Sequence, residues 1–281
     1  MKVKSEMQPS LISLKITDRI FGILNRIPYV AFYARTRGWE FILSWSHRIT
    51  GLLLVLYLWF HLITLSALRF PADYDAKMAL FSSPLVVFFE WLLAVPVIFH
   101  AFNGGRLMLF EIYGYRDDNA MIRWMFGVSA AYVCLMAVFM LLGDQSVSPI
   151  FFWLTVLVIA VIGGYAFLAR IWRLGHSQFW KFQRASGVFL LAMIPAHFLF
   201  MHLNPAAGKD SAVIIARMQS VFIKFVDLAM VLAVVYHGAY GLFSVGKDYI
   251  ASRPLQILMT LLVAGVMFWF AWIGLKLIFT I

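Results

Sequence analysis

Charged residues and cysteine are what this sequence has least of. Only 13% of its 281 residues are charged, whereas 63% are hydrophobic and the mean hydropathy is +0.87. A soluble domain of this size could not cover so much apolar surface, and its exterior would aggregate. The composition therefore excludes a soluble enzyme, a disordered chain and a nucleic-acid-binding protein, and it indicates an integral membrane protein.

The single cysteine, Cys134, lies in an apolar run and excludes a disulfide within the chain. An iron–sulfur cluster needs about four thiolates, so the chain does not hold one with its own cysteines. A glycine-rich phosphate loop of the GxGxxG or GxxxxGK[ST] type is also absent from the sequence. Any flavin, nucleotide or cluster chemistry must therefore belong to another subunit.

Long apolar segments dominate what is present. A membrane-spanning helix needs about 20 mostly apolar residues. Seven segments meet this requirement: about 41–69, 85–110, 122–142, 150–172, 183–203, 221–246 and 255–280. Residues 11–37 instead mix apolar side chains with lysine and arginine, which predicts an amphipathic segment in the cytoplasmic membrane interface. We therefore predict an all-α membrane bundle of seven transmembrane helices.

Lysine and arginine are distributed unevenly between the two sides of the predicted spans. Seventeen lie on the side of the N-terminus and six lie on the opposite side. Because cytoplasmic loops carry the excess of basic residues, we expect a cytoplasmic N-terminus and, after seven crossings, a C-terminus outside. The net charge of +10 then reflects membrane orientation and not a nucleic-acid surface.

An internal repeat is the most informative pattern. The segment Arg48–Gly51 (RITG), followed by His61, recurs as Arg184–Gly187 (RASG), followed by His197, at an offset of 136 residues. A second motif recurs at an offset of 137 residues. It comprises His100, Gly104 and Glu111, and then His237, Gly241 and Asp248.

Two parallel repeats follow from these offsets, because matching helices begin on the same basic side. The fourth span then serves as a return helix between the halves. The chain divides into an interfacial N-terminal segment (1–40), a first repeat (41–115), joining transmembrane helices (116–174) and a second repeat (175–281).

Four of the seven histidines lie deep inside predicted spans, at two matching depths. His61 and His197 each lie 13 residues past an arginine, and a rise of about 1.5 Å per residue places both about 20 Å from the inner surface. His100 and His237 lie about 9–16 Å from that surface. A single buried histidine is commonly a core residue bonded to backbone. Four at paired depths instead predict two haems, each held by two imidazoles.

Two glycines and two further histidines also have an expected role or location. Gly104 and Gly241 follow a histidine by four residues on the same helix face, which would let a flat macrocycle approach the backbone. His202 has no mate in the repeat, and we interpret it as a surface or propionate-side group. His176 lies in a short basic loop and is expected to be solvated.

At these motifs the sequence resembles the cytochrome b membrane anchor of succinate dehydrogenase and fumarate reductase, respiratory complex II. Ser44–Gly51 resembles the S-x-x-H-R-x-[ST]-G signature of the large anchor subunit, and His100–Arg106 resembles its H-x-x-x-G-x-R haem motif. His237–Tyr249 resembles the H-x-x-x-G…D-Y motif of the small anchor subunit. The resemblance covers about 40–115 and 175–280.

The resemblance implies a fused anchor with two haems b. His100 and His237 match the ligands of the haem nearest the dehydrogenase. His61 and His197 are absent from single-haem anchors and match the outer-haem ligands of single-chain, two-haem anchors. The alternative to two haems is a single haem in the chain. In some two-haem fumarate reductases a glutamate precedes the sixth-span ligand as a proton path. That position is Tyr236 here, which puts such a path in doubt.

A quinone site at the inner boundary is also implied by the resemblance. Ser44 and Arg48 match residues that line the family's inner quinone pocket, and Asp248 and Tyr249 match its aspartate and tyrosine. A tyrosine hydroxyl can donate to a quinone carbonyl, and an Asp–Arg pair can relay protons. The alternative is that Arg48 and Asp248 are ordinary interfacial charges. His47 is expected to contact a haem propionate.

By this resemblance, the chain docks a flavoprotein subunit and an iron–sulfur subunit on the cytoplasmic face of a prokaryotic inner membrane. It would bind quinone, with menaquinone favoured by the two haems, and would not touch succinate. Two alternatives remain open. One is the cytochrome b anchor of another oxidoreductase, such as a hydrogenase or formate dehydrogenase, and the other is a proton-coupled transporter with a histidine relay.

Overall fold

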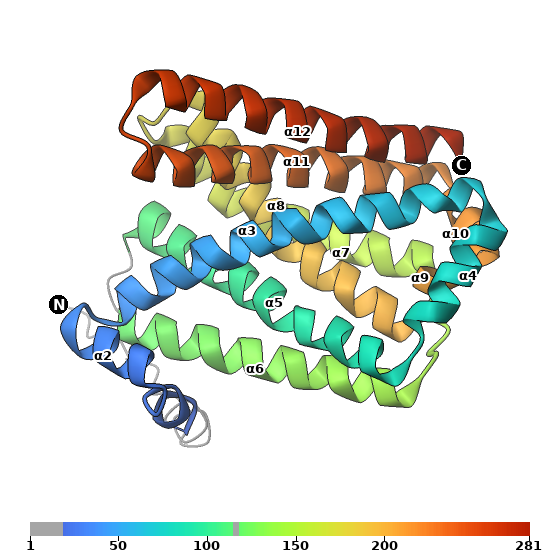
Figure 1. The fold of residues 1–281 in the computed structure, drawn as a ribbon, viewed down its shortest axis with the longest axis horizontal. Coiled ribbons are helices and arrows are strands. Elements are labelled where there is room, and N and C mark those ends of the chain that lie inside the picture. Colours follow the sequence, from blue (N-terminus) through green and yellow to red (C-terminus); the bar gives the residue numbers. More distant parts are fainter. Residues whose placement is uncertain (1–18, 115–117) are drawn as a thin grey trace.

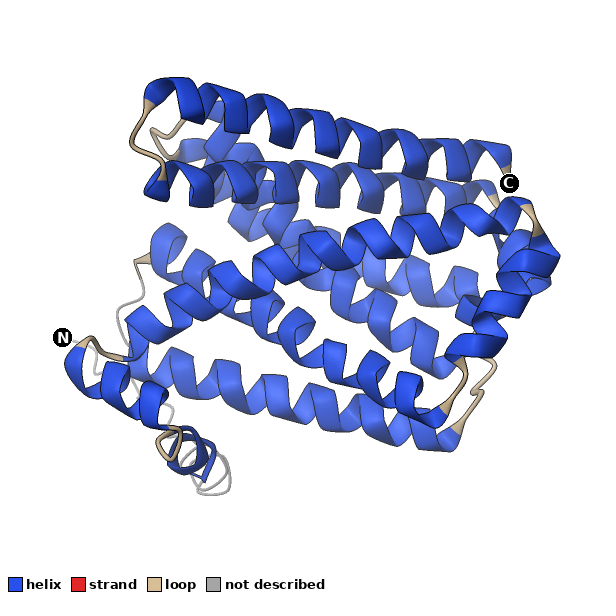
Figure 2. Cartoon of the chain, in the orientation of Figure 1, coloured by secondary structure: helices blue, strands red, loops and turns tan. Residues whose placement is uncertain are grey.

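Seven long helices form the molecule, and they match the seven spans expected from the sequence (Figure 1). They are α3 (Trp39–Ser66), α5 (Pro84–Tyr113), α6 (Asp118–Leu142), α7 (Pro149–Arg173), α8 (Gln178–Leu203), α11 (Val221–Tyr249) and α12 (Arg253–Thr280). The computed structural model describes residues 19–114 and 118–281, and this part of the chain contains no strand (Figure 2). The expected all-α transmembrane bundle is confirmed.

Short helices lie at both ends of the bundle (Figure 1). Helical residues 19–24 and α2 (Pro28–Thr36) lie at the end with the N-terminus. The opposite end, with the C-terminus, carries the short 3-10 helix η1 (Ala67–Arg69), α4 (Pro71–Phe81), α9 (Ala206–Lys209) and α10 (Ser211–Met218). We call these the inner and outer ends, after the orientation expected from the basic residues. Residues 11–18 of the expected amphipathic segment lie outside the described residues.

Serine and proline set where most spans begin. Serine immediately precedes α5, α7, α8, α11 and α12. The side chains of Ser148 and Ser177 accept a hydrogen bond from the backbone N–H three residues later. Proline occupies the first turn of α5, α7 and α12, where its missing N–H costs no helical hydrogen bond. These signals fix the helix ends near the membrane boundaries.

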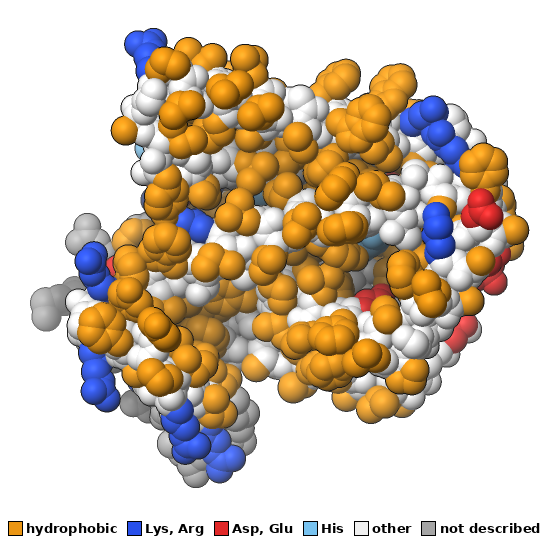
Figure 3. Space-filling view, viewed as in Figure 1, with side chains coloured by type: hydrophobic (Ala, Val, Ile, Leu, Met, Phe, Trp, Pro, Cys, Tyr) orange, Lys and Arg blue, Asp and Glu red, His pale blue; other side chains and the backbone are white. Residues whose placement is uncertain are grey.

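Consecutive spans pack as antiparallel neighbours: α5 with α6, α7 with α8, and α11 with α12 (Figure 1). α8 is the most enclosed span and contacts α5, α6, α7 and α11. Its buried side chains share one core cluster with those of α7, α9 and α11, namely Trp153, Met193, Phe200, Ala207, Ile223, Val226 and Met230. Apolar side chains also cover much of the outer surface, and charged ones gather toward the two ends (Figure 3). Such a surface suits contact with lipid.

Hydrogen bonds between α4 and the α9–α10 region close the outer end. The hydroxyl of Tyr74 donates to the carbonyl oxygen of Gly208 over 2.7 Å. The carboxylate of Asp75 accepts from the backbone N–H and the hydroxyl of Ser211, over 3.0 and 2.8 Å. Burial, reinforced by Asp75, raises the pKa of Tyr74 to about 12, so its hydroxyl remains a donor at neutral pH.

Candidate functional site

The four repeated histidines come together in two pairs inside the bundle. His100 on α5 and His237 on α11 have ring centres 6.5 Å apart and ring planes at 86°. His61 on α3 and His197 on α8 have ring centres 6.3 Å apart and ring planes at 85°. These are the two pairs that the sequence depths predict, and we call them the inner and the outer pair.

Both separations suit two imidazoles that hold one metal ion between them. A bond from a metal ion to an imidazole nitrogen is about 2.0–2.1 Å and that nitrogen lies about 1.2 Å from its ring centre, so end-on rings lie about 6.4 Å apart. Within residues 19–114 and 118–281, no group of three or more His, Cys, Asp or Glu side chains is arranged to hold a metal ion. Each pair therefore fits a cofactor that brings its own equatorial ligands, such as haem.

Hydroxyl groups of the repeated motif orient the inner pair. Thr50 Oγ1 and the backbone oxygen of His47 lie 3.2 and 3.1 Å from Nδ1 of His100. In the other half, Ser186 Oγ lies 3.4 Å from Nδ1 of His237. Both hydroxyls donate their own proton to a carbonyl of the preceding turn, so their oxygens can accept from Nδ1–H. This tautomer leaves Nε2 with a free lone pair, the form of imidazole that binds metal.

The glycines of the same motif make room for the two rings. A β-carbon on Gly51 would lie 3.0 Å from Cε1 of His100, and one on Gly187 would lie 3.2 Å from Cε1 of His237. Ordinary contacts between carbon atoms are about 3.5–4.0 Å, so a side chain at either position would displace the imidazole. The repeated hydroxyl–glycine pair thus supplies both the hydrogen bond and the space that each ring needs.

Gly104 and Gly241 lie in more open surroundings. A β-carbon on Gly104 would meet only Cε1 of His47, at 3.5 Å, and one on Gly241 would have no neighbour within 4 Å. The space beside Gly241 is consistent with the approach of a flat macrocycle, the role expected of both glycines. His47 itself stacks on His100, with ring centres 3.9 Å apart and planes at 6°.

His47 is also notable for a buried ring nitrogen. Its Nδ1 has no hydrogen-bond partner among the described residues. Buried polar atoms are nearly always hydrogen-bonded, so this nitrogen is a candidate contact for a further polar group beside the inner pair. A propionate carboxylate has the chemistry to fill that role.

Aromatic rings surround the outer pair. Tyr57 stacks on His61 with ring centres 5.5 Å apart, and Trp153 of α7 lies 6.3 Å from His197 at 36°. Nδ1 of His197 is buried and has no hydrogen-bond partner in the described part of the chain. The outer pair is therefore held mainly by packing. The contribution of α7 to it is one that sequence reasoning missed, because nothing in the local sequence marks Trp153.

At the inner boundary, Arg48 joins Asp248 and Tyr249. Its Nη2 donates to Oδ2 of Asp248 and its Nη1 donates to the phenol oxygen of Tyr249, each over 2.8 Å. Because the phenol oxygen accepts from Arg48, its own proton is free to be donated. The side chains of Arg48 and Asp248 are 32% and 50% exposed, so a ligand can reach the cluster. Ser44 is exposed one turn before Arg48, and Trp45 packs against Tyr249 at 5.8 Å.

A second arginine–carboxylate pair occupies the equivalent position of the repeat, and like the first it joins the two halves. Arg184 donates from Nε and Nη2 to the two carboxylate oxygens of Glu111, over 2.7 and 2.9 Å. Its neighbours differ from those of Arg48. Trp180 replaces the serine and lies 5.0 Å from the guanidinium, and the buried Ile112 replaces the tyrosine. This second pair thus lacks the free phenol donor.

The remaining histidines lie away from both pairs. Of the two expectations for His202, the surface position is wrong, because the residue is only 8% exposed and its Nδ1 lies 2.7 Å from the backbone oxygen of Phe198. The reason is that residues 143–148 fold over the outer end of α8, where the N–H of Val147 donates to the side chain of Asn204. The propionate-side role stays a prediction. His176 is exposed, as expected, and its ring centre lies 4.1 Å from that of Trp180, with the ring planes tilted by 33°.

Comparison with known proteins identifies the family. Residues 35–142 and 168–270 match the family described as "Succinate dehydrogenase/Fumarate reductase transmembrane subunit". The chain belongs to this family. One relative is the succinate dehydrogenase 2 membrane subunit SdhC of Mycobacterium tuberculosis (strain ATCC 25618 / H37Rv), which is 35% identical over 95 residues, covering 32% of this chain and 69% of the relative. No solved structure matches the chain.

Membership of the succinate dehydrogenase/fumarate reductase family decides against the two alternatives left by the sequence, a transporter and the anchor of an unrelated oxidoreductase. The matched segments include all four paired histidines and the cluster of Ser44, Arg48, Asp248 and Tyr249. They omit residues 143–167, which hold most of α7. They also include α6, which lies within the predicted joining helices (116–174).

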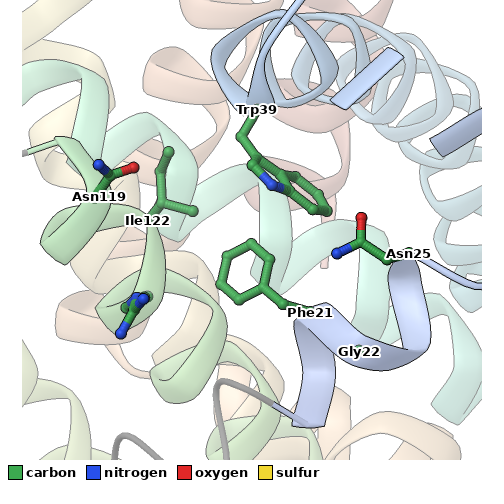
Figure 4. Close-up of a pocket in the computed structure, with 7 residues that line it drawn as sticks. Phe21, Gly22, Asn25, Trp39, Asn119 and Ile122 are labelled. Carbon is green, nitrogen blue, oxygen red and sulfur yellow. The ribbon is translucent and has the colours of Figure 1, made fainter. Parts of the chain in front are cut away.

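A pocket of about 380 Å³ in this anchor subunit lies at the inner end, away from these groups (Figure 4). It is formed between the N-terminal helical residues and the first turns of α3 and α6. Its lining comprises Phe21, Gly22, Asn25, Trp39, Asn119, Ile122 and Arg123. None of the predicted haem or quinone residues lines it, so it is separate from the candidate site.

Proposed function

We propose that this family member is the haem-bearing cytochrome b anchor of a succinate:quinone oxidoreductase. His100 and His237 would hold an inner haem b, and His61 and His197 would hold an outer one. The observation that carries the proposal is the shared geometry of the two pairs, whose ring centres are 6.5 and 6.3 Å apart. A bis-imidazole haem supplies reversible one-electron transfer when it is bound.

The protein's own contribution is to fix the ligands before haem binds. Thr50 and Ser186 hold Nδ1 of the inner histidines, which keeps their Nε2 atoms free for iron. The glycine after each hydroxyl residue sets how closely the ring approaches the neighbouring helix. His47, whose buried Nδ1 has no partner among the described residues, would contact a propionate of the inner haem.

The quinone would bind at Arg48, Asp248 and Tyr249. Reduction of a quinone to a quinol takes up two electrons and two protons. The phenol proton of Tyr249 would donate a hydrogen bond to one quinone carbonyl, and Ser44 offers a further hydroxyl one turn away on α3. Asp248 is half-exposed and would supply protons from the water at the inner boundary, with Arg48 fixing its position. Menaquinone is the quinone favoured by the two-haem resemblance.

The inner end is the side on which we place the soluble partners. Most lysine and arginine residues lie there, and so does the Arg48 cluster. An iron–sulfur subunit docked on that face would be nearest the quinone, with the flavoprotein subunit beyond it. This orientation puts the N-terminus in the cytoplasm and the C-terminus on the outer side of a prokaryotic inner membrane.

The test is the haem content of the purified complex. A pyridine haemochrome assay should give two haems b per anchor chain, and the reduced complex should show sharp α and Soret bands. One haem per chain would contradict the outer pair, and a colourless complex with full subunit content would contradict the whole proposal.

A further inference from the structure

Arg217 is a partly buried cation at the outer end that the functional site described above does not use. It lies near the C-terminal end of α10, which is at the outer end of the bundle (Figure 1). Its guanidinium carbon is 5.7 Å from the ring centre of Phe200, a side chain on α8 with no exposed surface. The guanidinium therefore points into the bundle and not toward water.

Two of its nitrogen atoms are buried without a partner. Nε and Nη1 of Arg217 have no hydrogen bond, and no ion pair of this arginine occurs among the described residues. Asp227 and Tyr74 lie close enough to act on its charge, but neither reaches hydrogen-bonding distance. Burial lowers the pKa of Arg217, and Asp227 opposes this effect. Arginine stays protonated in proteins, so Asp227 compensates this charge only at a distance, and the two unpartnered nitrogens can bind a further anion.

The position of this charge relates it to the outer histidine pair. Phe200, beneath the guanidinium, follows His197 by three residues and so lies on the same face of α8, about one turn toward the outer end. The charge of Arg217 also acts on the imidazole of His197. The free N–H groups therefore lie at the outer edge of the space beside His61 and His197.

We propose that Arg217 binds a propionate carboxylate of the outer haem. This inference rests on the proposed function, because it requires a haem between His61 and His197. A carboxylate pairs its two oxygens with two N–H groups on one edge of a guanidinium, here Nη2 together with either Nε or Nη1, and its negative charge compensates the positive one. A neutral quinone carbonyl would occupy one donor and leave the charge uncompensated. Haem is also the ligand that would bring a carboxylate to this depth.

The test uses Arg217→Gln and Arg217→Lys in the intact complex, with Arg69→Gln as the matched control. Arg69 lies at the same outer end, but its side chain is exposed. The readout is an optical redox titration, in which the outer haem is identified as the component lost in His197→Ala. Removing a nearby positive charge favours the ferric form, so Arg217→Gln should lower the outer haem's potential.

The expected change is about tenfold in the ratio of reduced to oxidised outer haem, equivalent to about 59 mV for a one-electron couple. Arg217→Lys keeps the positive charge but loses the paired N–H donors of the guanidinium, so it should shift the potential of the outer haem less, in the same direction. Arg69→Gln should titrate like the wild type. If the complex that carries Arg217→Gln does not assemble, the redox titration of the Arg217→Lys complex alone decides whether Arg217 binds the propionate.

Two full haems with an unchanged outer titration in either Arg217 variant would overturn the proposal. A shift confined to the inner haem would also overturn it. A wild-type complex with one haem per chain would instead refute the outer haem itself, and that outcome is visible before any variant is made.

Discussion

The hydroxyl oxygen of Thr50 lies 3.2 Å from Nδ1 of His100, and Ser186 repeats this contact with His237 at 3.4 Å. Each contact crosses from one span to its neighbour, from α3 to α5 and from α8 to α11. The glycine that follows each hydroxyl residue lies against the same ring. A four-residue motif on one helix therefore orients a histidine on another, which gives a physical reason for the motif and the histidine to recur together.

Loss of the Thr50 hydroxyl should shift the potential of the inner haem alone. A hydrogen bond to Nδ1–H makes an imidazole a stronger donor and stabilises ferric iron. Thr50→Val removes an acceptor and should raise the inner potential by about 20–60 mV, the equivalent of a hydrogen bond of about 0.5–1.5 kcal/mol. Ser186→Ala should act in the same direction. Redox titration of the purified complex measures both.

Thr155→Val is the matched control for that experiment. Its hydroxyl also donates to the preceding turn, over 2.8 Å, but it is exposed on α7. It should leave both haems unchanged. An inner potential that moves equally in Thr50→Val and Thr155→Val would show that the hydrogen bond to His100 is not the cause.

A methyl group at Gly51 or Gly187 should displace an inner ligand. The added carbon would lie 3.0 or 3.2 Å from the imidazole, and such overpacking typically costs about 1–3 kcal/mol. We expect Gly51→Ala and Gly187→Ala to lower the content of the inner haem and the melting temperature of the complex. Gly163→Ala on α7 meets no atom within 4 Å, so it should be neutral or slightly stabilising. Full inner haem in both alanine variants would rule out the steric role.

The sequence predicts the histidine pairs well because depth along a helix is nearly rigid. A rise of about 1.5 Å per residue fixes the level of each imidazole, and equal levels on repeated helices are sufficient to pair His61 with His197 and His100 with His237. The Arg48–Asp248–Tyr249 cluster is predictable for the same reason, because Asp248 and Tyr249 end α11 on the inner side and Arg48 lies in the inner half of α3.

Contacts that depend on helix rotation and on loop folding are not predictable in this way. Depth alone does not show that Thr50 faces His100, or that Gly51 and not Gly104 packs against the ligand ring. The position of Trp153 beside His197 depends on how α7 packs on α8. Arg217 lies on a short outer helix whose placement no local sequence pattern indicates, so its partial burial emerges only from the folded chain.

The two arginine–carboxylate pairs provide a matched test of the quinone site. Asp248→Asn should lower succinate:quinone turnover about tenfold or more, because it removes the proton-carrying group beside the quinone. Glu111→Gln alters the repeat-equivalent pair of Arg184 and Glu111, where the phenol is replaced by Ile112, and should leave turnover unchanged. Equal losses in both variants would show that the effect is structural.

Tyr249→Phe refines the same test. It removes one hydroxyl and keeps the ring, so haem spectra and assembly should stay intact. The loss of one donor to a bound carbonyl costs about 1–3 kcal/mol, which predicts a fall in turnover of about tenfold. Wild-type turnover in this variant would place the quinone elsewhere. Tyr165→Phe, on the exposed face of α7, is the control.

The pairing of the histidines is tested most directly by counting haems in double variants of the purified complex. Removing both members of one pair, in His61→Ala/His197→Ala or His100→Ala/His237→Ala, should leave one haem b per chain. Removing one member of each pair, in His61→Ala/His100→Ala, should leave none. One remaining haem in the cross-pair variant, or none in either within-pair variant, would contradict the assignment of one haem to each pair.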